Sequence, residues 1–375
     1  MKKLLSVLLA FFMVFALVGC SNNEDDNNGG TTGTEDGYKV AVVTDVGQLN
    51  DGGFNQGTYE GAVAFAEKNG LSYKYYQPAN GSDATDDDRI AAMRQAVEGG
   101  AEIVVTPGFL QAAALETVAK ENPEVKFVFV DGWNLGLDNV TAISYHEEES
   151  GFFAGYAAVM DGYTKLGGTF GGAGTNAACN RFAYGYVQGM QAAAAELDTT
   201  VEATISFLYG GSFSASTELQ TQISGWYTNG TEVVFACGGS MLQSVKAAAA
   251  ETENGKIIGV DTDQSAESDR VITSAFKNLS GSVDLTLTKW FEGKWDGELA
   301  DKLSNLGVGD EATGLPTAEG SWRFENFTVD QYHEVFAKVA DGSIKIDSDC
   351  ADLSTAAAWD GLKANCPNVT LTLEY

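Results

Sequence analysis

The 375-residue sequence has few basic residues: 22 lysines and arginines stand against 52 aspartates and glutamates, a formal net charge of −30 at pH 7. An electric field of that sign repels nucleic acid and anionic lipid headgroups. The composition therefore argues against nucleic-acid binding. We attribute the excess of carboxylates to the solubility of an exposed protein.

Metal-binding patterns are also missing. Only two histidines and five cysteines occur, with no CxxC pair and no His/Cys cluster, so neither a metal site nor another cofactor is predicted. Cys350 and Cys366 lie close together, and in an exported protein a disulfide between them could close a loop of about 15 residues and stabilise it by roughly 3 kcal/mol. Cys179 and Cys237 are expected at strand ends.

Long apolar runs are limited to one, Leu4–Val18, which follows two lysines. This run is shorter than the roughly 20 residues that a membrane-spanning helix needs. A basic start, a short apolar core and a small residue before the cleavage point indicate a secretory signal over residues 1–19. The mature chain is therefore expected to be exported.

The end of this signal, Leu17-Val18-Gly19-Cys20, resembles a bacterial lipobox. The resemblance implies that Cys20 becomes the lipidated N-terminus and anchors the chain at the extracytoplasmic face of the cell membrane. After it, residues 21–37 contain no apolar residue, so residues 20–37 are interpreted as the lipidated cysteine and a flexible tether.

The remaining length allows two domains. Short apolar runs such as Val40–Val43, Ile103–Val105 and Lys126–Val130 alternate with segments of helical spacing, which favours a parallel sheet with helices on both faces. A helix is expected over residues 147–160, and the same alternation starts again after it. The sequence therefore predicts two βα units in tandem.

One stretch, Asp45-Val-Gly-Gln-Leu-Asn-Asp-Gly-Gly-Phe-Asn-Gln56, stands between the first strand and the first helix. Ligands of open α/β sheets bind beyond the carboxyl ends of strands, where such loops lie. Carboxylates accept hydrogen bonds, a phenyl ring offers a stacking face, and an amide donates and accepts. Asp45, Asp51, Phe54 and Asn55 could therefore hold a polar, flat small molecule. The alternative is a turn with an Asn cap on the next helix.

The same stretch resembles the N-terminal signature of the basic membrane protein family, the purine nucleoside receptor-like substrate-binding lipoproteins of ABC transporters. This chain has Gly53 where that signature usually has Ser. The resemblance extends from Tyr38 to about Gly342. It implies a lipid-anchored, monomeric receptor, not an enzyme, that captures nucleosides, purine nucleosides foremost, and delivers them to an ABC permease by closure of two lobes.

The implied fold is the two-lobed type I periplasmic-binding-protein fold, an α/β fold in which each lobe is a parallel sheet flanked by helices. Lobe 1 is expected over residues 38–145 with a returning segment at about 278–320. Lobe 2 is expected over residues 146–277 with a segment at about 321–346. Residues 347–375 extend beyond the usual end of the family and are expected to form a local cap.

The family's binding residues match positions at expected strand ends of both lobes. The resemblance implies that two phenyl rings sandwich the base, that Asp45 and Asn55 bind its edge, and that three charged residues bind the ribose hydroxyls. The complete candidate set is Asp45, Phe54, Asn55, Asp131, Phe213, Gly239, Asp261 and Lys277.

Structural alternatives stay open for several of these residues. Phe213 could be an ordinary surface aromatic, Asp261 could cap a turn, and Asp131 could belong to a simple strand-end turn. Trp133 could equally lie at the rim of a cleft or in the core. Gly171-Gly-Ala-Gly174 could suggest a phosphate loop, but the GxGxxG fingerprint is absent, and close packing is the better interpretation.

Other functions also stay open. A receptor for a sugar or for a furanose-type signal would use similar aspartates and aromatics. A nucleoside or sugar hydrolase could use Asp45 and Asp131 as acid and base, although no nucleophile–base pair such as Ser–His is evident. A sensory protein that signals to a membrane partner would have the same sequence features as a transport receptor.

Overall fold

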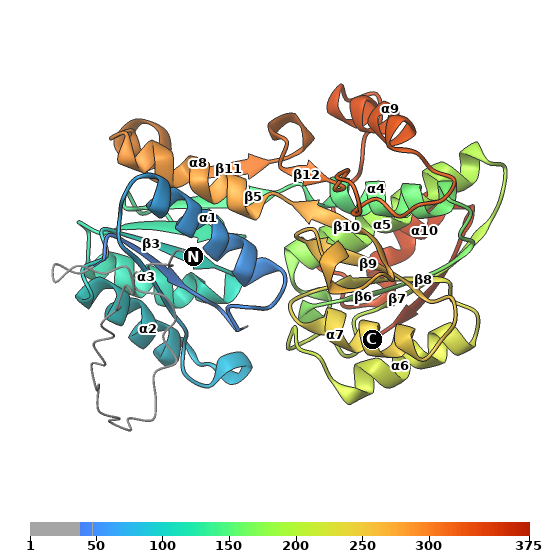
Figure 1. Cartoon of the computed structure of the whole chain (residues 1–375), viewed down its shortest axis with the longest axis horizontal. Helices are drawn as coiled ribbons and strands as arrows, with labels where there is room; N and C mark the ends of the chain where they lie inside the picture. The colour runs from blue at the N-terminus through green and yellow to red at the C-terminus, as the bar shows by residue number, and fades with distance from the viewer. Residues whose placement is uncertain (1–37, 47) are drawn as a thin grey trace, which may run out of the picture.

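The structure is a computed structural model that describes residues 38–46 and 48–375. It has two lobes, each built on one β-sheet (Figure 1). The predicted signal segment (1–19), the lipidated Cys20 and the tether (20–37) lie outside the described residues. Within the described part of the chain, no helix is long and apolar enough to cross a membrane.

The first sheet has six parallel strands in the order β11-β5-β4-β3-β1-β2. The apolar runs of β1 and β3 are buried, as expected for a sheet that is covered on both faces. Helices α1 and α8 cover one face and α2 and α3 the other. The elements of this lobe are β1 (Val40–Val43), α1 (Phe54–Lys68), β2 (Tyr73–Tyr76), α2 (Asp86–Glu98), β3 (Ile103–Pro107), α3 (Ala112–Glu121), β4 (Lys126–Val130), β5 (Val140–Tyr145), α8 (Leu279–Phe291) and β11 (Lys302–Leu306).

The second sheet has seven strands in the order β12-β10-β9-β8-β6-β7-β13, and every pair except β10–β12 is parallel. Helices α4 and α5 pack on one face and α6 and α7 on the other. The elements of this lobe are α4 (Glu147–Met160), β6 (Lys165–Phe170), α5 (Ala177–Glu196), β7 (Val201–Ser206), α6 (Thr217–Thr228), β8 (Val233–Cys237), α7 (Met241–Ala250), β9 (Lys256–Asp261), β10 (Val271–Lys277), β12 (Thr313–Gly314), α9 (Val329–Ala340), α10 (Asp360–Asn365) and β13 (Val369–Glu374).

The chain crosses between the lobes three times: from β5 to α4, from β10 to α8, and from β11 to β12. The returning segment of lobe 1 is expected to end at about residue 320, but the third crossing comes earlier. Strand β12 already belongs to the second sheet, where it pairs with Phe276 and Lys277 of β10. With only two residues, Thr313 and Gly314, strand β12 is too short to leave a periodic signal in the sequence. Three covalent connections of this kind restrict the lobes to movement about a common hinge.

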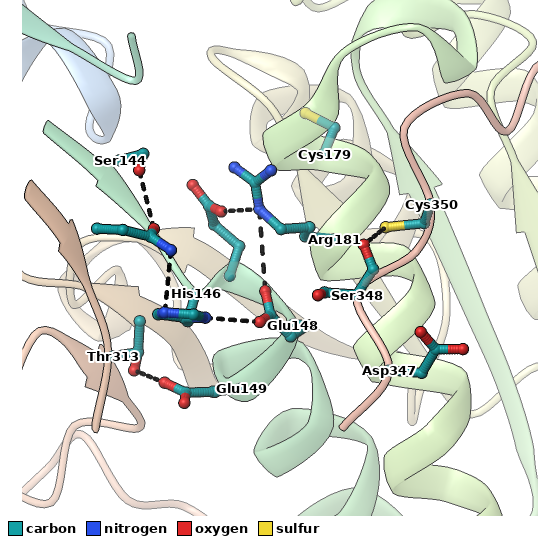
Figure 2. A network of polar contacts seen from close by, with 12 residues as sticks. Ser144, His146, Glu148, Glu149, Cys179, Arg181, Thr313, Asp347, Ser348 and Cys350 are labelled. Carbon is teal, nitrogen blue, oxygen red and sulfur yellow. Dashed lines mark hydrogen bonds and ion pairs between the residues drawn. The ribbon is translucent and has the colours of Figure 1, made fainter. Parts of the chain in front are cut away.

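Polar side chains tie the first crossing to the third (Figure 2). The Nδ1 of His146 lies 2.8 Å from Glu148 Oε1, and its Nε2 lies 3.0 Å from the amide nitrogen of Asn305. Glu149 accepts hydrogen bonds from Thr313 Oγ1 at 2.6 Å and from the backbone N–H of residue 308 at 2.8 Å. The hydrogen bond to Glu148 raises the pKa of His146 above its usual value. These contacts hold the crossing segments side by side.

The C-terminal extension differs from the expected local cap. Its strand β13 pairs in parallel with β7 over six residues, so the extension completes the edge of the second sheet. Trp359 is fully buried and lies near Tyr184 and Phe207, with ring centroids 6.1 and 6.2 Å away. Leu353 donates its backbone N–H to the Gly174 carbonyl at 2.8 Å. The extension is therefore an integral part of lobe 2.

Candidate ligand-binding site

A cavity of about 630 Å³ lies between the lobes, beyond the carboxyl ends of strands from both sheets. The eight residues named from the sequence all line it, together with residues that the sequence argument did not select. The lining residues used below are Asp45, Asp51, Phe54, Asn55, Asn80, Phe109, Asp131, Cys179, Phe213, Cys237, Gly239, Asp261 and Lys277.

The loop after β1 is shaped by the buried carboxylate of Asp51. It accepts the backbone N–H groups of Gly53 at 2.9 Å, Asn55 at 3.0 Å and Gln56 at 3.2 Å, which are unpaired donors of the first turn of α1. Burial, opposed by these hydrogen bonds, raises the pKa of Asp51 to about 6. Asp51 thus caps the helix whose first residues, Phe54 and Asn55, face the cavity.

Asn55 and Asp45 are held against each other on the wall of lobe 1. The Asn55 amide donates to Asp45 Oδ1 at 3.0 Å and to Asp51 Oδ2 at 3.2 Å. Gly108 stands close by, because a Cβ placed on it would come within 2.2 Å of Asp45 Oδ2. The structure therefore fixes the orientation of the Asp45 carboxylate at the cavity surface. The Asn cap that the sequence left open is an Asp51 cap instead.

Lys277 is the centre of a buried charge cluster at the end of β10. Its ammonium nitrogen lies 2.7 Å from Asp131 Oδ2, 3.4 Å from Glu147 Oε1 and 3.5 Å from Asp261 Oδ1. Burial alone would lower the pKa of Lys277, but the three carboxylates raise it well above its ordinary value. The lysine is therefore charged at neutral pH. Asp131 comes from lobe 1 and Asp261 from lobe 2, so the cluster joins the lobes.

Burial raises the pKa values of Asp131 and Asp261, and the neighbouring ammonium of Lys277 opposes both shifts. Glu147 behaves differently, because Arg181 donates to it at 2.5 Å from the opposite side. Burial would raise the pKa of Glu147, but Arg181 and Lys277 together lower it. The cluster thus combines hydrogen-bond acceptors with one ammonium donor. Such a set suits hydroxyl groups of a neutral ligand.

Four cavity residues have left-handed backbone conformations although none is glycine: Asn80 (φ 67°), Asp131 (φ 55°), Phe213 (φ 57°) and Asp261 (φ 66°). This conformation is uncommon for side chains with a Cβ and is concentrated at functional sites. Asp131 follows β4 of the first sheet and Asp261 ends β9 of the second sheet. Phe213 lies in the loop between β7 and α6. Three of these four residues, Asp131, Phe213 and Asp261, are positions that the sequence argument selected.

Aromatic rings stand on both walls of the cavity. Phe54 of lobe 1 lies with its ring centroid 5.0 Å from the Lys277 ammonium. The ring centroid of Phe213 in lobe 2 lies 6.3 Å from that of Phe109 in lobe 1. Phe213 packs tightly on glycines, since a Cβ on Gly171 would come within 2.3 Å of its ring and a Cβ on Gly239 within 2.4 Å of its carbonyl oxygen. Close packing therefore explains Gly171, as the sequence favoured.

Sequence reasoning missed Phe109, Glu147 and Arg181 as neighbours of the site. Phe109 lies two residues after the end of β3 and could have been found by that position. Glu147 and Arg181 lie on helices α4 and α5, and their meeting depends on how these helices pack. Trp133 is 47% exposed, packs edge-on against Phe129, and is not among the residues that line the cavity.

The cysteines differ from the expectations. Cys237 ends β8 as expected, but Cys179 lies in the first turn of α5, and both line the cavity as buried free thiols. Cys350 and Cys366 are also free, so the predicted disulfide is not formed. Both are buried, and the Cys350 Sγ donates instead to the Ser348 carbonyl at 3.4 Å (Figure 2).

The two sheets and the cavity between the lobes define the structural class, the periplasmic-binding-protein fold. A solute-binding protein of an ABC transporter system from Aeropyrum pernix K1 superposes with a TM-score of 0.70, at 22% identity, over 88% of this chain and 97% of that one. This likeness confirms the predicted periplasmic-binding-protein fold.

Sequence comparison gives the family. The model of PnrA-like ABC transporter substrate-binding proteins matches residues 38–339, and the chain belongs to this family, as its loop signature indicated. It is 29% identical to the ABC transporter nucleoside-binding protein BmpA of Lactococcus lactis over 82% of this chain and 90% of that protein. It is 26% identical to the CD4+ T-cell-stimulating antigen of Listeria innocua over 91% and 96% of the two chains.

Proposed function

We propose that this substrate-binding protein captures neutral nucleosides, purine nucleosides foremost, and presents them to an ABC permease. The observation that carries the proposal is the pairing of Phe54 and Phe213 on opposite walls of a cavity that also contains the Lys277 cluster. The name of the Lactococcus lactis relative, a nucleoside-binding protein, supports the same ligand class.

The two parts of the site suit the two parts of a nucleoside. Stacking on an aromatic ring is worth roughly 1–3 kcal/mol per base and tolerates different bases. Hydrogen bonds to charged groups contribute about 1.5–3 kcal/mol each, so Asp131, Asp261 and Lys277 are able to hold the ribose hydroxyls. Asn55, which donates to both Asp51 and Asp45, and Asp45 itself would bind an edge of the base.

A phosphate suits this cavity poorly. Its charge would meet Asp45, Asp131 and Asp261, while the ammonium of Lys277 is already surrounded by carboxylates. The guanidinium of Arg181 is turned to Glu147. An anion that loses its hydration without gaining a partner binds weakly. We therefore propose that nucleotides and free amino acids are rejected.

Transport follows from two-lobe closure in this proposal. The lobes close around the nucleoside, and the permease recognises the closed form. Lipidation of Cys20 would keep the receptor beside its permease at the extracytoplasmic face of the membrane, with the segment 21–37 as the tether. In the hydrolase alternative Asp131 would serve as an acid or base, but both its oxygens accept hydrogen bonds from Lys277, at 3.0 and 2.7 Å.

The test combines identification and mutation. Mass spectrometry of small molecules released from gently purified protein is expected to find a nucleoside. In calorimetric titration with adenosine, Phe54→Ala and Phe213→Ala are each expected to weaken binding by roughly five- to 150-fold, the equivalent of about 1–3 kcal/mol. Phe291→Ala, a change at a phenyl ring that is 51% exposed on α8, is the control. Unchanged affinity in both cavity variants would refute the sandwich.

A further inference from the structure

Two side chains of lobe 2 donate hydrogen bonds to one backbone carbonyl of lobe 1, outside the ligand cavity. The Gly52 carbonyl accepts a hydrogen bond from Thr262 Oγ1 at 2.9 Å and another from Gln264 Nε2 at 2.9 Å. Gly52 belongs to the loop after β1, and the other two residues follow β9. We propose that Thr262 and Gln264 are positioning residues that latch the lobes together and set how long a bound ligand is retained.

Hydrogen bonds within lobe 2 fix the position of Gln264. It is 1% exposed, its Oε1 accepts the Val260 N–H at 2.8 Å, and its backbone N–H donates to Ser274 Oγ at 3.0 Å. The side chain is therefore ordered before the lobes meet, and its amide group points its remaining donor at lobe 1. Little conformational entropy is lost when the contact forms.

The acceptor is equally fixed. Gly52 has a left-handed conformation (φ 69°) that directs its carbonyl, and its N–H donates to Gln56 Oε1 at 3.1 Å. The neighbouring Asp51 ties the same loop to the first turn of α1. The latch therefore joins two preorganised groups, and separation of the lobes would break both hydrogen bonds at once.

The latch acts on the ligand only through the loop that it holds. Thr262, Gln264 and Gly52 do not line the cavity, whereas Phe54, two residues after Gly52, does. Latching therefore keeps the Phe54 wall against the ligand without contacting the ligand itself. This inference rests on the proposed function for the identity of the ligand, but the contact between the lobes stands independently of it.

The position of the latch makes a specific kinetic prediction. Loss of either hydrogen bond should speed dissociation of every nucleoside by the same factor and leave association nearly unchanged, because the contact forms after encounter. A residue that touches the ligand would instead change the preference between nucleosides. A hydrogen bond of this type typically changes an equilibrium constant by about three- to tenfold.

The experiment is stopped-flow measurement of adenosine and inosine binding to the full-length protein carrying Thr262→Val or Gln264→Glu. Thr262→Val keeps the shape and removes the donor. Gln264→Glu keeps the acceptor for Val260 and turns a carboxylate towards the Gly52 carbonyl. Thr221→Val and Gln95→Glu, changes at exposed helix positions, are the matched controls. Thermal melting confirms that each variant folds.

We expect both nucleosides to dissociate about three- to tenfold faster from Thr262→Val, and faster still from Gln264→Glu at pH 8. The Gln264→Glu defect should shrink towards pH 5, because a protonated carboxyl can again donate to the Gly52 carbonyl. Unchanged dissociation rates in both variants would overturn the latch, as would a factor that differs between adenosine and inosine.

A ligand-independent measurement separates the two proposals. If the wild-type protein binds no nucleoside, the proposed function fails, and the latch is then decided by small-angle scattering of the wild type and the Thr262→Val/Gln264→Glu double variant. A larger radius of gyration in the double variant supports the latch, and an unchanged radius overturns it.

Discussion

Replacement of Lys277 by methionine tests the charge cluster most sharply. The change keeps most of the apolar stem and removes an ammonium that is 2.7 Å from Asp131, 3.4 Å from Glu147 and 3.5 Å from Asp261. Of these carboxylates, Glu147 alone has a second cationic partner in the described structure, Arg181. Removal of one partner from a buried ion pair typically costs about 3–5 kcal/mol. We expect Lys277→Met to lose that much free energy of unfolding at pH 8.

The pH dependence gives the prediction its sign. Without the ammonium, the pKa values of Asp131 and Asp261 rise further in the folded protein. A carboxyl with a raised pKa contributes stability that is present at low pH and is lost as pH rises through the folded-state pKa. The deficit of Lys277→Met relative to wild type should therefore be larger at pH 8 than at pH 5.5.

Urea unfolding of wild type and Lys277→Met at both pH values measures this deficit. Lys120→Met is the control, because Lys120 forms an exposed pair with Glu116 on α3 and its loss should change stability little. A deficit below about 1 kcal/mol at both pH values, or one that grows as pH falls, would refute the argument that the buried carboxylates depend on Lys277.

Three further changes test other parts of the molecule. The pKa of Asp51 is about 6 in the folded protein and about 3.9 in the unfolded chain, so its contribution to stability grows as pH falls and is lost as pH rises through 6. Wild type should therefore gain about 1.4 kcal/mol over Asp51→Asn between pH 7 and pH 5 in urea unfolding, and a loss would mean that the hydrogen bonds lower this pKa. Asp261→Asn should discriminate adenosine from its 2′-deoxy form less well in calorimetric titration, because an amide accepts hydroxyl donors more weakly than a carboxylate; an unchanged affinity ratio would remove Asp261 from the sugar site. Trp359→Ala should reduce the free energy of unfolding by about 3–5 kcal/mol, as expected for a fully buried tryptophan, and a loss near zero would show that the extension folds independently of lobe 2.

Much of the fold follows from local sequence patterns. Apolar runs such as those of β1 and β3, each followed by an amphipathic segment, predict buried parallel strands and covering helices. The same logic places residues that follow strands at the cavity edge, which is where the structure has Asp131 and Phe213. Strand ends converge in space whatever the intervening sequence, so this part of the site was within reach of the sequence.

Contacts between distant elements were out of reach. Arg181 meets Glu147 because α4 packs against α5, and no local pattern encodes that meeting. The pairing of β13 with β7 joins residues more than 160 positions apart in a way that short strands do not specify. The free thiols of Cys350 and Cys366 show that closeness in sequence does not make a disulfide, because the geometry of the two side chains decides it.

The central claim is that the cavity accepts a neutral nucleoside and rejects its charged relatives. Calorimetric titration of the purified protein with adenosine, adenosine monophosphate and a panel of amino acids tests it directly. The account predicts binding of adenosine and no measurable binding of the monophosphate or the amino acids. Equal affinity for the nucleoside and its monophosphate would contradict the assignment of Asp45, Asp131 and Asp261 to the ligand cavity.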